Sequence, residues 1–404
     1  MPLRSLQALC LVNFFLADVR DGLGPFLGIF LTEHHWKPDD IGFIMTAGGL
    51  AGLAATLPAG LLTDATSRKR LLLFVGCLLI TVSTLLLWFF PQTLTATLSQ
   101  LVTGISAACI APVVAGITLG LTGKAGFNRQ MGKNEAFNHA GNFSAAVIAG
   151  IATWYWGTGA VFILMTTMAL FTAFSVLLIR DRDIDNRAAR GEGSAVSPAP
   201  VLPFKALCQH SALMVVGLTL LLFHLGNAAL LPMLSMRAAA LEPHSAVPAG
   251  VYAAATVVIS QCVMIPVALL TSARADKYGY RSLIMLALLV LPVRAAIAAS
   301  SAAPLMLLPV QVLDGVAAGI LGVAIPGYIV QLLNGSGHTN AGQAFIMLLQ
   351  GAGAAFSPAL TGIITTRYSW SAAFATLGGI AILALCLWWL AGRLHLLPSH
   401  TAED

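Results

Sequence analysis

Charged and amide side chains inside long apolar segments are the residues of this sequence that could do chemistry. Asp18, Arg20 and Asp21 lie in the first such segment. Asp18 and Asp21 are three residues apart and would share one face of a helix, within reach of the long Arg20 side chain. In a lipid bilayer such groups either pair with one another for structural reasons or line a pathway for substrate or protons. Both interpretations stay open for this triplet.

Similar polar groups recur at comparable depth in later apolar segments. His224 and Asn227 are one helical turn apart, and Gln311 stands one turn before Asp314. His224 could equally be a hydrogen-bonded histidine of the helix core. Burial favours the protonated form of a carboxyl group, so the acids of these segments could take up and release a proton during a working cycle.

A third set of polar residues lies on one helical stretch near residue 140. Glu135, His139 and Asn142 follow a helical stripe, and Asn138 stands beside it. We expect Glu135, the shallowest of them, to belong to a cytoplasmic charge network, and the three deeper residues are candidates for contact with substrate. Arg294 is instead expected to pair structurally or to extend its head towards the membrane surface.

The composition indicates which class of protein holds these residues. Of the 404 residues, 58% are hydrophobic and only 9% are charged, whereas soluble proteins carry about a quarter charged residues. This excludes an ordinary soluble enzyme, a disordered chain and a nucleic-acid binder. The long apolar runs predict an all-α polytopic membrane protein with twelve transmembrane helices. The predicted helices are 6–32, 41–62, 70–90, 94–121, 134–155, 158–179, 208–236, 249–272, 282–301, 304–333, 342–366 and 370–392.

The distribution of basic residues predicts the orientation. Most of the 21 Lys and Arg residues fall in loops on one side, whereas only Lys37, Arg237 and Arg367 fall in loops on the other. Basic loops stay on the cytoplasmic side of a membrane. We therefore expect both termini in the cytoplasm and the protein in a bacterial-type plasma (inner) membrane, and the net charge of +5 needs no nucleic-acid partner.

The chain divides into two similar halves. Residues 1–180 and 207–404 each contain six predicted helices, and the polar, Ser- and Pro-bearing segment 181–206 is interpreted as a cytoplasmic linker. The halves match at an offset of about 212 residues. Such a parallel repeat predicts a pseudo-two-fold axis along the membrane normal and a substrate site near the midplane between the halves. The matched residues include Asp64 with Asp276, Gly104 with Gly315, and Gly141 with Gly353.

Two loops carry a recognisable pattern. Gly60-x-x-x-Asp64-x-x-x-Arg68-Lys69-Arg70 resembles the cytoplasmic signature of the major facilitator superfamily, and the loop around Asp276, Gly279 and Arg281 resembles its second copy. Ala65, Ser67 and Ser272 depart from the usual residues of that pattern. The resemblance implies that the first, fourth, seventh and tenth helices line a central cavity. It also implies a cytoplasmic gate, to which we assign Gly60, Asp64, Arg68, Asp276, Arg281 and, by its position, Glu135.

Together these features predict a secondary active transporter that moves a small organic solute by proton-coupled alternating access. No GxxxxGK(S/T) motif, cofactor motif or metal-ligand spacing occurs in the sequence, so we expect no ATP-driven transport, no cofactor and no enzyme activity. We expect a monomer whose partners are the solute, protons and the lipid bilayer.

The direction of transport is less strongly indicated. Drug/proton antiporters of the resembled family often carry an Arg where Gln100 stands, and a Gly-Pro pair in the fifth helix. Here Ser357-Pro358 keeps part of that second pattern in the eleventh helix. Efflux by proton antiport is the favoured prediction. One alternative is proton-coupled uptake of an anionic metabolite, which would be held by Arg20, His139 and His224. The other is a membrane receptor or scaffold that does not transport.

Overall fold

The computed structural model describes residues 3–21, 23–189, 209–241, 247–333 and 339–397. Over these ranges the regular elements are helices and no strand occurs, which confirms the all-α fold class. Ten helical segments in this part of the chain are long and apolar enough to cross a membrane. They are Pro38–Ala65, Lys69–Phe89, Thr93–Gly123, Gly159–Leu178, Ser211–Leu241, Ala249–Ala275, Tyr280–Ser300, Pro304–Leu332, Gly342–Arg367 and Trp370–Arg393.

The other two predicted spans are helical too, but they are more polar. The first is divided into α1 (Leu3–Asp21) and α2 (Gly24–Glu33). The fifth is the second part of α5 (Thr93–Trp156), beyond Gly123. Both segments contain the acidic, amide and histidine side chains that the sequence marks as candidate site residues, and these side chains lower the mean hydropathy below that of the other ten.

The predicted loop between the fourth and fifth spans is reduced to one residue. Residues 122–133 are helical on both sides of Gly123, which separates the two parts of α5 with φ 62° and ψ −178°. Glycine adopts a positive φ without strain, so the chain changes direction there within one residue. The Gln, Met, Lys and Arg residues that follow favour helix and extend it where a loop was expected.

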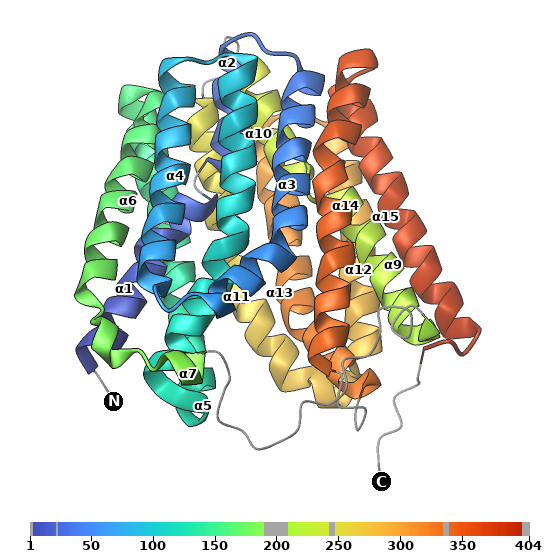
Figure 1. Cartoon of the computed structure of the whole chain (residues 1–404). Helices are drawn as coiled ribbons and strands as arrows, with labels where there is room; N and C mark the ends of the chain where they lie inside the picture. Colours follow the sequence, from blue (N-terminus) through green and yellow to red (C-terminus); the bar gives the residue numbers. More distant parts are fainter. Residues whose placement is uncertain (1–2, 22, 190–208, 242–246, 334–338, 398–404) are drawn as a thin grey trace. The chain divides into compact units, whose positions relative to one another are not determined.

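The structure forms two compact units. Unit 1 contains Met1–Trp36, Ala47–Ser197 and Glu242–Ala255. Within it α1, α4 (Lys69–Phe89), α5 and α6 (Gly159–Leu178) pack against one another, as Figure 1 shows. Unit 1 differs from the predicted first half, 1–180, in three places. The start of α3 (Pro38–Ala65) belongs to unit 2, whereas the start of α11 (Ala249–Tyr278) and residues 181–197 belong to unit 1.

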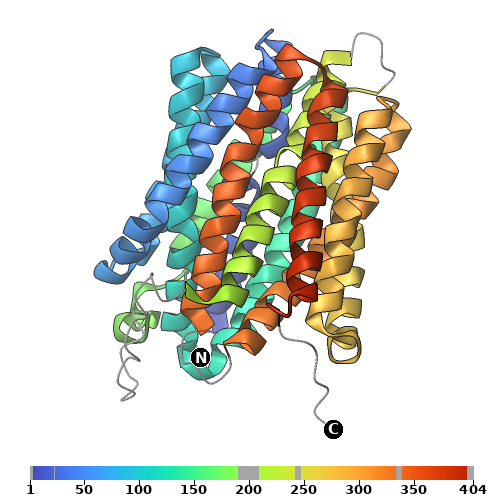
Figure 2. The ribbon, with the colours of Figure 1, turned by 90° about the vertical axis from the view of Figure 1, so that its right-hand side faces the viewer.

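Unit 2 contains Lys37–Thr46, Pro198–Leu241 and Thr256–Asp404. Its helices include α9, α10, α12, α13, α14 and α15, and α14 and α15 both run beside α9 (Figure 2). The 3-10 turn η3 (Pro304–Met306) leads into α13. The bounds are Ser211–Asn227 for α9, Leu230–Leu241 for α10, Tyr280–Ser300 for α12, Leu307–Leu332 for α13, Thr339–Arg367 for α14 and Trp370–Arg393 for α15.

The beginning of the predicted linker is packed onto unit 1. Residues 190–206 lie outside the described part of the chain, but the preceding residues form η1 (Asp181–Asp183) and α7 (Asn186–Ala189). Asp185 N donates to Gly120 O at 3.0 Å, and Ser5 Oγ donates to Asp183 Oδ2 at 2.6 Å. These bonds attach the segment to α5 and α1, so it is an ordered part of the helical unit and not a free connection.

The sequence repeat recurs in the packing of the helices. A Cβ on Gly141 would collide with the carbonyl of Phe14 in α1, and a Cβ on Gly353 would collide with the carbonyl of Leu221 in α9. Each glycine thus lets two backbones approach more closely than any other residue allows. Gly104 makes the same kind of approach to α3, and its repeat partner Gly315 to α11.

These contacts predict the effect of one methyl group. Gly353→Ala should lower the free energy of unfolding by about 1–3 kcal/mol, because α14 must move away from the α9 backbone. Gly379→Ala in α15 is the matched control, since no atom lies within 4 Å of a Cβ at that glycine. Thermal unfolding in detergent, followed by tryptophan fluorescence, should show a lower midpoint for the first variant only. Equal midpoints for both variants would refute this account of the repeat.

Candidate functional site

An ion pair between α12 and α13 forms the centre of the candidate site. The Nη1 atom of Arg294 and the Oδ1 atom of Asp314 are 2.6 Å apart. The Arg294 side chain is 2% exposed, whereas that of Asp314 is 18% exposed. A guanidinium buried this deeply needs an opposite charge beside it. The pair therefore fixes α12 against α13 and leaves part of the carboxylate accessible.

The second carboxylate oxygen of Asp314 contacts α11. Ser260 Oγ lies 2.7 Å from Asp314 Oδ2 and 2.9 Å from Gln311 Oε1. One hydroxyl proton serves only one of these acceptors at a time. As drawn, Gln311 Nε2 is buried and has no hydrogen-bond partner among the described residues. Exchanging the N and O atoms of the Gln311 amide gives each group a partner: Nε2 then donates to Ser260 Oγ, and Ser260 donates to Asp314.

A fourth helix joins the same group of bonds. Arg294 Nη1 donates to Asn227 Oδ1 in α9, while Arg294 Nε has no hydrogen-bond partner within the described chain. Four helices of unit 2 thus meet around one charge pair. We call these side chains the polar cluster: Asn227, Ser260, Arg294, Gln311 and Asp314.

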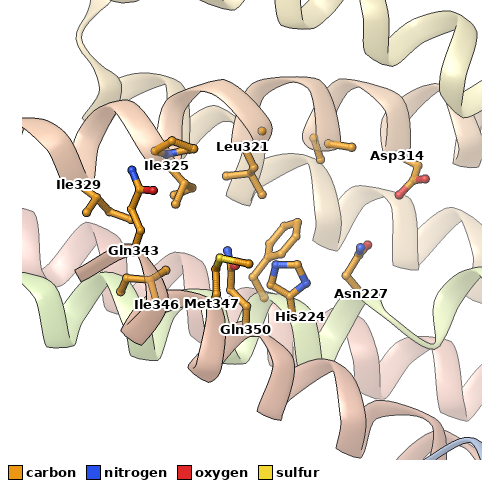
Figure 3. A pocket seen from close by; sticks show the side chains of 15 residues that line it. His224, Asn227, Asp314, Leu321, Ile325, Ile329, Gln343, Ile346, Met347 and Gln350 are labelled. Atoms are coloured by element: carbon orange, nitrogen blue, oxygen red, sulfur yellow. The ribbon is translucent and has the colours of Figure 1, made fainter. Parts of the chain in front are cut away.

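The polar cluster borders a cavity of about 360 Å³ within unit 2 (Figure 3). Leu321 and Ile325 from α13 form one wall, and Met347 from α14 lies opposite them, near His224. Asp314 lies at one end of the cavity. Its lining is mainly apolar, with a few polar groups that could orient a ligand, which is the usual character of a small-molecule site.

Three residues predicted from the sequence meet at this cavity. His224, Asn227 and Asp314 all line it. Gln311, also predicted, is fully buried behind Asp314 in the polar cluster. Arg294 pairs structurally, as the sequence suggested, and its partner is Asp314.

Several members of the site were not predicted. Ser260 gave no signal in the sequence, because a single serine in an apolar helix is common. Gln343 and Gln350 line the cavity from α14. Gln350 matches Asn138 at the repeat offset of about 212 residues, and this match could have pointed to it.

The candidate residues of α1 belong to unit 1. Asp18 is buried and Arg20 is partly buried, and both have interaction partners. The side chain of Asp21 lies outside the described part of the chain. A cavity shared between these residues and Asp314 stays a prediction.

The polar stripe of α5 is also in unit 1. Glu135 is exposed, while Asn138, His139 and Asn142 are partly buried. The Nδ1 atom of His139 is buried and has no hydrogen-bond partner among the residues described. An unsatisfied buried ring nitrogen is costly, which keeps His139 a candidate for contact with a solute.

Next to this stripe lies a buried hydrogen-bond network that the sequence did not predict. Gln130 Nε2 donates to Asn134 Oδ1 at 3.0 Å, and Asn134 Nδ2 donates to Thr118 Oγ1 at 3.0 Å. Gln130 also contacts Cys10 Sγ at 3.3 Å. The network ties both parts of α5 to α1. The sequence gives little signal for it, because Gln130 lies in the predicted loop 122–133 while Thr118 and Asn134 lie in two separate predicted helices.

The predicted gate residues of the first loop make few contacts. Asp64 and Arg68 are exposed, and nothing lies within 4 Å of a Cβ built on Gly60. The assignment of Gly60, Asp64 and Arg68 to a cytoplasmic gate stays a prediction. In the second copy, the Arg281 carbonyl accepts a hydrogen bond from Trp388 Nε1 at 3.3 Å, and the Asp276 side chain lies outside the described residues.

The two basic residues that end the first loop do hold helices together. Lys69 is 1% exposed, and its Nζ donates to Thr63 O and Thr66 O at 2.8 Å each, which caps the C-terminal end of α3. Arg70 donates to the last carbonyls of α6 and pairs with Asp181 at 2.6 Å. Cations at helix C-termini are favourable because they meet the negative end of the helix dipole.

The seventh predicted span is broken beside the cavity. Helix α9 ends at Asn227 and α10 begins at Leu230. The buried Ser357 hydroxyl of α14 bridges the gap: it donates to Leu225 O at 2.7 Å and accepts from Ala229 N at 3.1 Å. A side chain inserted between the i and i+4 backbone partners is a known cause of a helix kink. The break thus lies directly beside Asn227 of the polar cluster.

Comparison with known proteins agrees with this architecture. The model of the Major Facilitator Superfamily matches residues 9–293 and 216–403. The chain belongs to this superfamily. An uncharacterised MFS-type transporter of Mycobacterium tuberculosis, from strains CDC 1551 and H37Rv, is 37% identical over 384 residues, which cover 94% of this chain and 91% of the relative. The protein is accordingly a multi-pass membrane protein and a secondary transporter of the MFS type.

Solved structures show the same fold. The nucleoside transporter NupG superposes with a TM-score of 0.77 at 13% identity and covers 97% of this MFS chain and 100% of its own. A point variant of NupG gives 0.78 at 13% identity, with coverages of 96% and 99%.

The ion pair of this MFS transporter predicts a specific pattern of stability. Arg294→Gln should lower the free energy of unfolding by about 3 kcal/mol, because it leaves Asp314 without its countercharge. The double variant Arg294→Gln with Asp314→Asn should recover part of this loss, since no unpaired charge remains. Thermal unfolding in detergent tests the cycle. A double variant as unstable as the sum of the single variants would contradict the pairing.

The break in α9 predicts a second pattern. Ser357→Ala should lower the free energy of unfolding by about 1–3 kcal/mol, because it leaves the part-buried Leu225 carbonyl and the buried Ala229 N–H unsatisfied. Thr361→Val is the matched control: this hydroxyl is also buried, but it bonds only to carbonyls of its own helix. The same unfolding assay should show a clear loss for the first variant and a small change for the second. The reverse order would show that Ser357 does not support the break.

Proposed function

We propose that this transporter exports a small organic solute in exchange for protons. The observation that carries the proposal is the position of Asp314. Its carboxylate is partly exposed at the end of an apolar cavity and forms an ion pair with the buried Arg294. As the sequence predicts, we place both termini in the cytoplasm and the protein in the inner membrane, and we take a monomer as the transporting unit.

Proton coupling follows from the chemistry of this carboxylate. When Asp314 is ionised, it offers acceptor oxygens and negative charge to a solute in the cavity. When it takes up a proton, that charge is lost and the ion pair with Arg294 weakens. Proton and solute therefore compete for the same group. Competition of this kind produces exchange, because binding of one ligand promotes release of the other.

The lining of the cavity favours a particular class of solute. Its walls are mostly aliphatic, with one phenylalanine and the side chains of His224, Gln343 and Gln350. No Lys or Arg occurs among the described residues that line it. An uncharged or singly cationic, largely apolar solute fits this lining better than an anion, so the lining supports export over uptake of an anionic metabolite.

The proposal predicts a separation between exchange and coupling. In proteoliposomes, an antiporter accumulates solute when the interior is acidic, because outward proton flow drives solute inward. Asp314→Asn should abolish this accumulation, because an amide cannot carry the proton. It should leave a weaker solute–solute counterflow, because the amide oxygen still accepts a hydrogen bond from a solute. Three solute classes should be tested: a lipophilic monocation, an uncharged aromatic amide and an aromatic monocarboxylate.

Two controls make the experiment decisive. Asp314→Glu keeps a titratable carboxyl group and should retain part of the accumulation. Asp185→Asn removes an acid that does not line the cavity and whose Oδ1 accepts from two backbone N–H groups of α7, and it should leave coupling intact. Accumulation that requires an alkaline interior would show symport instead, and unchanged coupling in Asp314→Asn would remove Asp314 from the mechanism.

A further inference from the structure

A second cavity in unit 2 lies between α11, α12 and α13 and shares no lining residue with the first. Its volume is about 390 Å³. Leu270 from α11, and Leu283 and Leu286 from α12, form apolar walls. Leu270 is 59% exposed and Leu286 is 49% exposed. Exposed apolar patches of a membrane protein mark surfaces that meet the membrane, so we expect this groove to open to the lipid chains.

One end of the groove is polar and basic. Arg274, Tyr278 and Ser282 line this end, close to the turn between α11 and α12. Arg274 is exposed and forms no ion pair or hydrogen bond with any residue that the structure describes. The neighbouring Lys277 lies over the Tyr278 ring, with Nζ 5.4 Å from the ring centroid. The polar end of the groove is thus lined by one cation and two hydroxyl groups, and a second cation, Lys277, lies beside it.

The backbone keeps this arrangement compact. Gly279 has φ 72° and is the single residue between α11 and α12. A residue with a side chain is strained at that φ. The glycine therefore brings the basic end of α11 next to the first turn of α12, where Ser282 lies.

We propose that this groove binds one anionic phospholipid. The phosphate lies at Arg274, within reach of the Tyr278 and Ser282 hydroxyls, and an acyl chain lies along Leu270, Leu283 and Leu286. Arginine suits a phosphate because its planar fork donates two parallel hydrogen bonds. Basic pockets between membrane helices on the cytoplasmic side are a recognised form of lipid headgroup site, and the charge distribution predicts that this end is cytoplasmic.

Both ends of the groove are needed to specify this ligand. A soluble anion would use the cations but not the walls that open to hydrocarbon. A zwitterionic lipid would fill the walls, but its own positive headgroup would oppose Arg274 and Lys277. An anionic lipid satisfies both parts. Because α13 closes the groove with Val316, two residues after Asp314, the lipid would also contact the helix that carries the candidate site.

Native mass spectrometry of the full-length transporter in detergent tests the proposal. Phosphatidylglycerol and phosphatidylcholine with identical acyl chains are the probes. One phosphatidylglycerol should be retained per chain in preference to phosphatidylcholine. Arg274→Gln should weaken phosphatidylglycerol binding about five-fold, the effect of one basic residue near a lipid surface. Arg274→Lys should retain most of the binding.

Three comparisons decide the outcome. Arg393→Gln removes an exposed arginine that rests on Trp389, outside the groove, and should leave binding unchanged. Leu283→Trp fills the groove and should reduce retention of the lipid while leaving the unfolding midpoint of the lipid-free protein near that of the parent. Equal losses in Arg274→Gln and Arg393→Gln would overturn the proposal. Displacement of the lipid by millimolar inorganic phosphate would also overturn it, because that would indicate a site for soluble anions.

Discussion

The rest of the site depends on one constraint: Arg294 carries a charge that is almost completely removed from solvent. Such a charge is tolerated only beside an opposite charge and enough hydrogen-bond acceptors. Asp314 and Asn227 supply them, and the Ser260 hydroxyl lies within hydrogen-bond distance of both Asp314 and Gln311. Four helices are thereby fixed to one another by groups that each need the others.

The same constraint makes the site able to respond. A carboxylate that both balances a buried cation and faces a cavity has two possible partners, and a proton changes which one it prefers. The break in α9 lies beside this point, where Ser357 replaces a backbone hydrogen bond. A helix that is already interrupted there can change its direction at low cost, because no continuous ladder of backbone bonds must first be broken. The carboxylate that can change its charge and the break in α9 thus belong to the same part of the site.

The two halves share their helix packing but differ in their polar residues. Matched glycines such as Gly141 and Gly353 make equivalent close contacts, so the helix packing is common to both. The polar side chains on these helices differ between the two halves. Where unit 2 has Gln311 and Asp314, unit 1 has Gln100 and Thr103, which border a shallow groove of about 380 Å³ lined by glycine, alanine and threonine. At the position of Asp314 the first half thus has the uncharged Thr103, so the matched helices differ in charge although they share the same glycine packing.

The sequence by itself determined the membrane class, the helical fold and the positions of most spans, because every segment that crosses a bilayer must be apolar and helical. It also showed the repeat, because matching residues recur at a fixed spacing. It also indicated His224, Asn227 and Asp314, since polar groups at that depth are costly wherever they occur. Only the tertiary structure decided that Arg294 is the partner of Asp314 and that Ser260 belongs with them. It also decided that Lys69 and Arg70, rather than Gly60 or Asp64, hold the helix ends in this structure. Those assignments depend on which faces of separate helices meet, and residues far apart in the chain carry no local signal of their distance in space.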